Sequence, residues 1–288
     1  MPIARPFPQL LVSSPDTPHA VAEIMHKLSQ AFQEEGIIKD ANDTLQFHES
    51  TAGSLLEESK SLLTTPSDPS TWRHHHIVVY RDGSLPPTTY TDSYFNISLF
   101  FQHLSSLRSP VSSSHGSWPL GSALFFSPSV TSTQTLLDKN PLYLSSLPTP
   151  TVHIASYQLQ GRGRGSNVWL SPSGSLSQSI HLRLAKDQGV PWSKLVFVQY
   201  LYALAVCEGL RDESVLGDDD EDDDDGGQGW RVRIKWPNDV YALVGAKQSE
   251  MNKQKIAGIL VSTSFNSEGD AEIIIGAFRF TFHSCYVC

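Results

Sequence analysis

Short strand patterns on both sides of one long helical pattern limit the folds that residues 125–275 can adopt. Residues 179–184 alternate Ile and Leu with Ser, His and Arg, which is typical of a half-buried strand. Residues 194–211 carry Leu, Val, Ala and Tyr at helical spacing and predict a mostly buried helix. Hairpin-like connections with one helix laid across the strands favour an α+β fold over a regular βαβ repeat. Further strands are expected at residues 152–157, 232–235, 256–263 and 272–275.

Residues 1–115 are rich in Ser, Pro and Thr and predict a partly ordered N-terminal region with one or two helices. One helix is expected over residues 20–32, because Val21, Ile24 and Leu28 fall on one face.

Three consecutive histidines, His74, His75 and His76, lie in the N-terminal region. Adjacent residues of a strand point to opposite faces of its sheet, so the three rings are not expected to converge on one metal ion. The sequence therefore predicts no metal site at this position.

The formal net charge of −9 argues against a nucleic-acid-binding protein, because phosphate binding needs dense clusters of Lys and Arg. Much of this charge comes from residues 218–225, and we expect residues 217–229 to form a disordered acidic insertion. No stretch approaches the roughly 20 apolar residues that span a bilayer, so no membrane partner and a cytoplasmic location are expected. Three cysteines are too few for a disulfide framework or a zinc site and fit a reducing compartment: Cys207, Cys285 and Cys288.

A glycine- and arginine-rich stretch, Gly161-Arg-Gly-Arg-Gly165, follows the predicted strand at residues 152–157. Its glycines permit close approach of backbone amides to a ligand, and its arginines supply forked cationic donors for phosphate or carboxylate. The stretch lacks the third glycine of a dinucleotide-binding loop and the Gly-Lys-Ser/Thr ending of a P-loop. A flexible loop and an RNA contact that uses Trp169 as a stacking platform remain alternatives.

Three other short motifs could carry chemistry. Lys235-Trp-Pro-Asn-Asp239 comes at a strand end, where a fixed lysine could stabilise a carboxylate, a phosphate or the charge of an acyl-transfer transition state. The alternative is a solvated strand-end lysine beside a packing tryptophan. In Lys255-Ile-Ala-Gly258, the glycine leaves room for a ligand or a neighbouring backbone. Thr131-Ser-Thr-Gln134 is most simply a helix N-cap, which is compatible with ligand binding.

Taken in order, these four motifs resemble the signature of the biotin protein ligases: Thr131-Ser-Thr-Gln, Gln158-x-x-Gly-Arg-Gly-Arg-Gly-x-Asn-x-Trp, Lys235-Trp-Pro-Asn-Asp and Lys255-x-x-Gly-Ile-Leu. The resemblance implies an α+β fold, a mixed sheet with packed helices like that of lipoate ligases and class II tRNA synthetases. It also implies a ligase that activates biotin with ATP and Mg²⁺ to biotinyl-AMP and transfers it to a lysine in the biotin carboxyl carrier domain of a carboxylase. The expected division is an N-terminal remnant of a larger domain at residues 1–115, an incomplete catalytic domain at 116–276 and an atypical tail at 277–288.

The resemblance assigns roles to the motif residues. Lys235 would stabilise charge at the biotin carboxylate and the α-phosphate, while Arg162 and Arg164 would close a loop over the adenylate; these three form the expected catalytic set. Ser132, Thr133 and Gln158 would hydrogen-bond the biotin ureido group. The expected biotin- and adenylate-binding set is Ser132, Thr133, Gln134, Gln158, Gly161, Gly163, Gly165, Trp169, Asn238, Asp239, Lys255 and Gly258.

The sequence departs from the family after residues 272–276, where family members continue with a Gly-x-Asn stretch and a small barrel-like domain. We therefore expect a truncated C-terminus, which leaves two alternatives within the fold: a catalytically impaired fragment that still binds biotin or adenylate, and a lipoate ligase-like enzyme.

Overall fold

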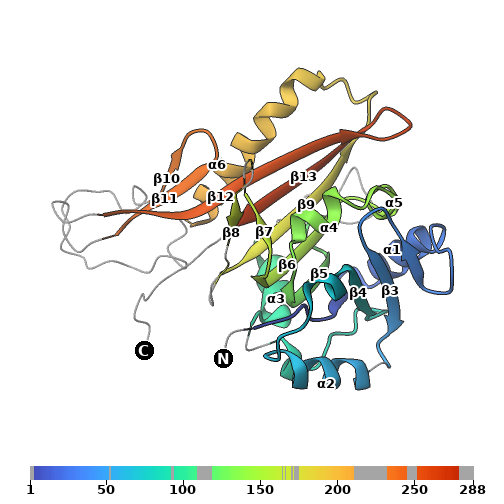
Figure 1. The fold of residues 1–288 in the computed structure, drawn as a ribbon. Helices are drawn as coiled ribbons and strands as arrows, with labels where there is room; N and C mark the ends of the chain where they lie inside the picture. The colour runs from blue at the N-terminus through green and yellow to red at the C-terminus, as the bar shows by residue number, and fades with distance from the viewer. Residues whose placement is uncertain are drawn as a thin grey trace.

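The computed structural model describes residues 3–51, 53–91, 94–108, 119–163, 165, 167–169, 171, 175–210, 232–244 and 252–278. Eleven strands form one sheet in the order β10-β11-β12-β13-β9-β6-β5-β1-β4-β3-β2, and helices lie on both of its faces (Figure 1). The expected acidic insertion at 217–229 lies outside the described residues. Of the expected tail at 277–288, residues 277 and 278 are described, and they end β13.

The strands of the large sheet are β1 (Gln9–Ser13), β2 (Ile37–Lys39), β3 (Thr44–Glu49), β4 (His74–Val79), β5 (Ala123–Val130), β6 (Thr151–Gln158), β9 (Ser177–Leu184), β10 (Val232–Lys235), β11 (Asp239–Val244), β12 (Asn252–Phe265) and β13 (Ala271–Phe278). A separate hairpin pairs β7 (Gly161–Arg162) with β8 (Val168–Trp169). The α-helices are α1 (His19–Ser29), α2 (Gly53–Leu62), α3 (Ile97–Leu107), α4 (Thr133–Asp138), α5 (Pro141–Ser146) and α6 (Val198–Leu210). Short 3-10 helices are η1 (Pro69–Arg73), η2 (Thr88–Tyr90) and η3 (Trp192–Phe197).

From β6 through β9, β13, β12 and β11 to β10, each strand is antiparallel to the next, whereas β6 is parallel to its other neighbour, β5. This arrangement confirms the predicted α+β fold with a mixed sheet and packed helices. The prediction that residues 179–184 form a half-buried strand is wrong for the start of that segment. Ser179, Ile180 and His181 are all buried, because α4 covers one face of β9 and apolar side chains cover the other.

The N-terminal region forms a parallel α/β arrangement. Strands β1, β4 and β3 are parallel, and β1 also pairs with β5 in antiparallel register, so one sheet continues from this region into the rest of the chain. Helix α1 packs on β1, and the expected apolar positions Val21, Ile24 and Leu28 are all buried. The region therefore holds more regular structure than the partly ordered segment expected from its composition.

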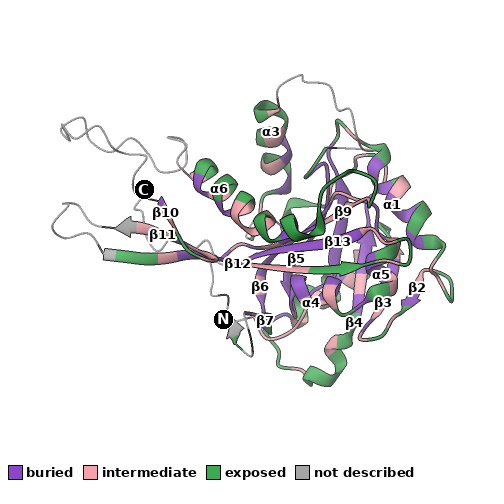
Figure 2. Cartoon of the chain, turned by 90° about the horizontal axis from the view of Figure 1, so that it is seen from above, coloured by how far each residue is buried: buried purple, intermediate pink, exposed green. Residues whose placement is uncertain are grey.

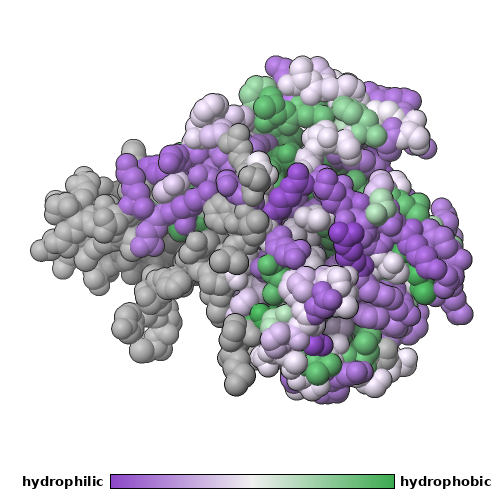
Figure 3. Space-filling view, in the orientation of Figure 1, coloured by the Kyte–Doolittle hydropathy of each residue, from purple (hydrophilic) through white to green (hydrophobic). Residues whose placement is uncertain are grey.

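Helix α6 and the preceding η3 form one continuous helical segment, Trp192–Leu210, that contacts β10, β11 and β12. The prediction that it is mostly buried is wrong: Leu195, Ala203 and Cys207 are buried, but Leu201 is 65% exposed. Figure 3 shows hydrophobic surface over α6 at the top of the molecule. By length and composition alone, this segment of 19 residues, which contains an 18-residue window of mean hydropathy 1.2, could cross a membrane, and this corrects the expectation that no stretch approaches that length. A core helix can pass the same test.

The alternation of side chains along the strands divides the core into two layers, and β5, β6 and β13 are largely buried (Figure 2). Leu10, Phe126 and Ile275 belong to the layer that packs with α2 and α3. Leu11 and Phe125 belong to the layer that packs with α1, α4 and α5.

A buried ionic network lies in the second layer. His181 Nε2 lies 2.6 Å from Glu272 Oε2, and Arg183 Nε donates to Glu272 Oε1 at 2.7 Å. Burial lowers the pKa of His181, so its imidazole is neutral at pH 7 and donates a hydrogen bond. Although burial opposes it, the hydrogen bonds from His181 and Arg183 lower the pKa of Glu272 and keep it ionised. This network joins β9 to β13 beneath α4 and α5.

Candidate functional site

The carboxyl ends of β5 and β6 lie at the same edge of the sheet, because the two strands are parallel neighbours. Helix α4 starts three residues after β5, and Ser132 is its N-cap: the Ser132 hydroxyl accepts a hydrogen bond from the backbone N–H of Thr135 at 3.2 Å. The N-cap predicted for residues 131–134 is therefore confirmed. The edge brings the start of α4 next to Gln158, the last residue of β6.

Three buried polar side chains meet at this edge. The backbone N–H of Thr133 donates to Gln158 Oε1 at 2.9 Å, and Ser179 Oγ on β9 donates to Thr133 Oγ1 at 2.8 Å. The bond from Thr133 fixes the Gln158 amide, because only its oxygen can accept. Gln158 Nε2 is then left buried without a hydrogen-bond partner among the described atoms. Since an unsatisfied buried donor costs about 1–3 kcal/mol, a ligand that offers a carbonyl oxygen would be favoured here.

Gln134 connects this cluster to a strand farther across the sheet. Its side chain is fully buried, and Nε2 donates to Ser262 Oγ on β12 at 3.1 Å. Its Oε1 has no partner among the described atoms, so the position offers an acceptor as well. Helix α4 thus lies over β6, β9 and β13 and reaches β12 through one side chain.

The glycine- and arginine-rich stretch forms the β7–β8 hairpin beside Gln158. Gly161 pairs with Trp169, the N–H of Gly163 donates to Asn167 O at 2.8 Å, and Gly165 takes φ = +64°, a conformation that glycine adopts without strain. Arg162 is ion-paired with Asp138 at the end of α4. Arg164 and the side chain of Trp169 lie outside the described residues.

The strand-end turn predicted at residues 235–239 is present between β10 and β11. Lys235 is exposed, and its ammonium lies 5.1 Å from the centroid of the Tyr241 ring. Asn238 fixes the turn to β12: its side chain donates to Ile259 O at 3.2 Å, and the N–H of Ile259 donates to Asn238 O at 2.8 Å. Gln199 Nε2 of α6 donates to Pro237 O at 2.6 Å. The lysine is therefore carried on a turn held from two sides.

The space beside Gly258 is filled by an ion pair. Lys255 Nζ lies 2.6 Å from Asp239 Oδ1. A Cβ at Gly258 would come within 3.3 Å of Lys255 Nζ and 3.7 Å of Asp239 Oδ1. In this structure the glycine thus gives room to the Lys255–Asp239 pair, and Lys235 lies at the edge of the same sheet region.

The expected residues form two clusters. Thr133, Gln134 and Gln158 are brought together at the start of α4, whereas Lys235, Asn238, Asp239, Lys255 and Gly258 gather on β10–β12. Ser262, which contacts the first cluster, lies four positions along β12 from Gly258 in the second. At about 3.3 Å per residue this corresponds to roughly 13 Å.

Sequence reasoning did not find Ser179, Ser262 or Asp138. Ser179 was visible as a polar position in a predicted strand, but its contact with α4 depends on a fold that places the two together. Within the described ranges, no group of three or more His, Cys, Asp and Glu side chains is placed to hold a metal ion.

Comparison with known proteins identifies the family of the segment that holds both clusters. Residues 126–277, slightly more than half of the chain, match the biotin/lipoate A/B protein ligase family. The chain belongs to this family. All four motifs quoted above lie within the matched residues. The match to the biotin/lipoate ligase family begins in β5 and ends in β13.

Two relatives of this biotin/lipoate ligase chain are biotin--protein ligases. The protein from Schizosaccharomyces pombe is 36% identical over 149 residues, which cover 50% of this chain and 22% of the relative. Biotin--protein ligase 2 from Arabidopsis thaliana is 34% identical over 180 residues, covering 61% of this chain and 43% of the relative. The chain therefore spans less than half the length of either.

A solved structure of biotin acetyl coenzyme A carboxylase synthetase from Helicobacter pylori with bound biotinylated ATP also resembles this biotin/lipoate ligase chain. The two sequences are 25% identical in the aligned part, which covers 57% of this chain and 64% of the Helicobacter pylori chain, and the TM-score is 0.36.

Proposed function

We propose that this chain is a biotin protein ligase that activates biotin with ATP to biotinyl-AMP and transfers the biotinyl group to a lysine of a biotin-dependent carboxylase. The observation that carries the proposal is the buried cluster at the start of α4. Gln158 Nε2 is a buried donor without a partner among the described atoms, and the Thr133 hydroxyl lies 3.5 Å from Gln158 Oε1. The preceding residue, Ser132, supplies a second hydroxyl at the N-cap of α4. A cyclic urea offers one carbonyl oxygen and two N–H groups, which complement a donor beside hydroxyl acceptors.

In the first half-reaction, a biotin carboxylate oxygen attacks the α-phosphorus of ATP and pyrophosphate leaves. Lys235 would stabilise the negative charge shared by the carboxylate and the phosphoryl group, because it is a compact cation on a turn held by hydrogen bonds. Mg²⁺ would screen the charge of the triphosphate. Arg162, on the hairpin beside Gln158, would act with Arg164 to cover the mixed anhydride and keep water from it.

In the second half-reaction, the ε-amine of a lysine on a biotin carboxyl carrier domain attacks the acyl carbon of biotinyl-AMP. An amide forms, the acyl–phosphate bond breaks and AMP leaves. We place this reaction in the cytoplasm, with biotin, ATP and the carrier domain as partners.

Exchange of labelled pyrophosphate into ATP tests the first half-reaction. We expect exchange that depends on biotin and falls at least a hundredfold in Lys235→Ala. Lys253→Ala is the matched control, because Lys253 is an exposed lysine of β12, two strands from Lys235, and should keep exchange within twofold. Lipoate-dependent exchange without biotin-dependent exchange would overturn the choice of substrate. A folded sample that binds biotin but shows no exchange would make the chain a binding fragment of the family.

A further inference from the structure

One face of the helical segment Trp192–Leu210 is apolar and exposed, while the opposite face packs on the sheet. Ala203, on the packed side, is buried in the same layer as apolar side chains of β10 and β11. On the other side, Phe197, Leu201 and Leu204 are 49%, 65% and 57% exposed. Figure 2 shows exposed residues along α6, and Figure 3 shows hydrophobic surface over the same helix.

The exposed residues have the spacing of a helix that pairs with another helix. Leu201 lies four positions after Phe197, and Leu204 lies three positions after Leu201. Exposed Lys194 precedes Phe197 by three positions, and exposed Glu208 follows Leu204 by four. Residues spaced in this way lie along one side of a helix and form the contact seam of paired helices. These five residues form a stripe, which we call the α6 stripe, with an apolar centre and opposite charges at its two ends.

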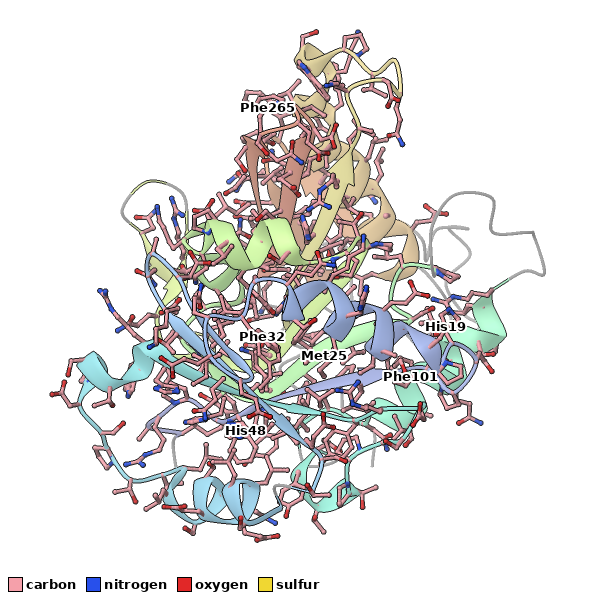
Figure 4. All side chains as sticks on the ribbon, turned by 90° about the vertical axis from the view of Figure 1, so that its right-hand side faces the viewer. His19, Met25, Phe32, His48, Phe101 and Phe265 are labelled. Carbon is pink, nitrogen blue, oxygen red and sulfur yellow. The ribbon has the colours of Figure 1, made fainter. Side chains whose placement is uncertain are left out.

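Contacts within the chain hold the α6 stripe in place. Lys194 Nζ lies 5.6 Å from the centroid of the Phe197 ring, which keeps the lysine on the stripe. Trp192 packs edge-on against Phe265 at the end of β12, with ring centroids 5.3 Å apart. Figure 4 shows Phe265 on the far side of the molecule from His48. A surface that is already ordered loses little conformational entropy when it binds.

A second protein surface fits the α6 stripe better than a lipid bilayer does. One side of the segment Trp192–Leu210 is covered by β10, β11 and β12, so that side cannot face lipid. Lys194 and Glu208 stand in line with the exposed apolar residues, and a bilayer core would strip both charges of water. Another protein can instead place an opposite charge beside each of them.

We propose that the α6 stripe binds the α6 stripe of a second copy of this chain, with the two helices antiparallel. In a symmetric pair centred on Leu201, positions equally far before and after Leu201 meet each other. Lys194 lies seven positions before Leu201 and Glu208 seven positions after it. Each lysine therefore faces the glutamate of the other copy, and the leucines meet at the centre. A parallel pair would bring lysine to lysine and glutamate to glutamate.

This interface leaves the candidate ligase site uncovered. Val232 and Val240 pack in the apolar layer on the α6 side of the sheet. Because side chains alternate along a strand, Lys235 and Asp239 lie on the opposite face. The proposal is independent of the ligase function, and dimerisation and pyrophosphate exchange can fail separately.

Sedimentation equilibrium of the full chain over about a hundredfold range of concentration tests the proposal. We expect a mass that rises with concentration toward twice the 31.8 kDa of one chain. Since one helix pair is a small interface, the Kd should lie in the micromolar range. Leu201→Glu should weaken dimerisation at least tenfold, because two carboxylates would meet at the centre. Leu107→Glu is the matched control, since Leu107 of α3 is 77% exposed and should change the Kd less than twofold.

Exchanging the end charges tests the orientation of the two helices. At low ionic strength, Lys194→Glu and Glu208→Lys should each weaken dimerisation at least threefold, because each places like charges together at both ends of the pair. The double variant that carries both changes should return to within twofold of the unaltered Kd. A parallel pair would gain nothing from the double exchange, since like charges would still face each other.

Three results would overturn the proposal. They are a chain that stays monomeric at the highest concentration, a dimer whose Kd is unchanged in Leu201→Glu, and a double charge variant that dimerises no better than the single variants. Phosphatidylcholine vesicles test the lipid alternative: binding of the unaltered chain to them without dimerisation in solution would also overturn the proposal. Circular dichroism checks that each variant is folded.

Discussion

The acid limit of stability is expected to depend on His153, a residue of β6. Its side chain is 1% exposed and stacks on Phe125, with ring centroids 4.4 Å apart and planes 2° from parallel. Neither of its ring nitrogens has a hydrogen-bond partner among the described atoms. An imidazole in this position resists protonation, because the charged form would lose its hydration without gaining an acceptor.

The magnitude follows from the shift in pKa. Burial, with a smaller contribution from neighbouring His181, lowers the pKa of His153 to about 3, against an ordinary value of about 6.5. A depressed pKa contributes stability that is fully present above pH 6.5 and is lost as pH falls toward 3. One pH unit corresponds to about 1.4 kcal/mol, so about 2 kcal/mol should be lost between pH 7 and pH 5.

Urea unfolding of the chain and of His153→Phe at pH 7 and pH 5 tests this reasoning. The phenyl ring can keep the stack on Phe125 and cannot be protonated. We expect the stability of the variant relative to the unaltered chain to rise by about 2 kcal/mol between pH 7 and pH 5. His26→Gln changes an exposed side chain and should shift stability by less than about 0.5 kcal/mol at either pH. If the unfolding free energy of His153→Phe differs from that of the unaltered chain by the same amount at both pH values, His153 is not the source of the pH dependence.

Two further substitutions test the elements that hold the site. Glu272→Ala should destabilise the fold by about 3–5 kcal/mol in urea unfolding, because it leaves His181 and Arg183 without their buried acceptor. The control Glu268→Ala changes an exposed side chain and should cost less than about 0.5 kcal/mol. Similar losses of stability in both variants would contradict the network. Ser132→Ala should cost about 1 kcal/mol through loss of the α4 cap and Ser132→Gly only a few tenths, so a larger loss in the glycine variant would argue against capping.

Local patterns predicted elements more reliably than they predicted burial. The strand expected at residues 232–235 has those bounds, and the helix expected at 20–32 is present as α1 (His19–Ser29). The helix expected at 194–211 is also present, but it is apolar on all sides. A helix with no polar face gives no sign of which side is covered, and its burial depends on elements that the local sequence does not specify.

The composition of residues 1–115 also did not predict how much regular structure the N-terminal region contains. Ser, Pro and Thr are frequent in its connections, while its strands are short: β1 has five residues and β2 has three. Such short strands are stable because they join β3 and β4 in a sheet that continues into the strands of residues 123–278.

The motifs located most of the candidate site, but they did not predict its contacts. The N-cap at Ser132 and the turn that begins at Lys235 follow from local sequence, and both are present. Ser179 contacts Thr133 of α4, which lies 46 positions earlier in the sequence, and Ser262 contacts Gln134, which lies 128 positions earlier. Contacts of that separation are set by strand register, which short motifs do not contain.

The pairing of β1 with β5 makes the order of synthesis important for this chain. Ser13 pairs with Ala123, 110 positions later, while Gln9 pairs with Ile77. At about 5–20 residues per second, a ribosome needs roughly 6–22 s to make the intervening residues. During that time β1 can join β4, but its other edge has no partner strand. The nascent N-terminal region therefore presents an open, apolar strand edge, and a chaperone that covers it until residues 123–130 emerge would raise the yield of folded protein.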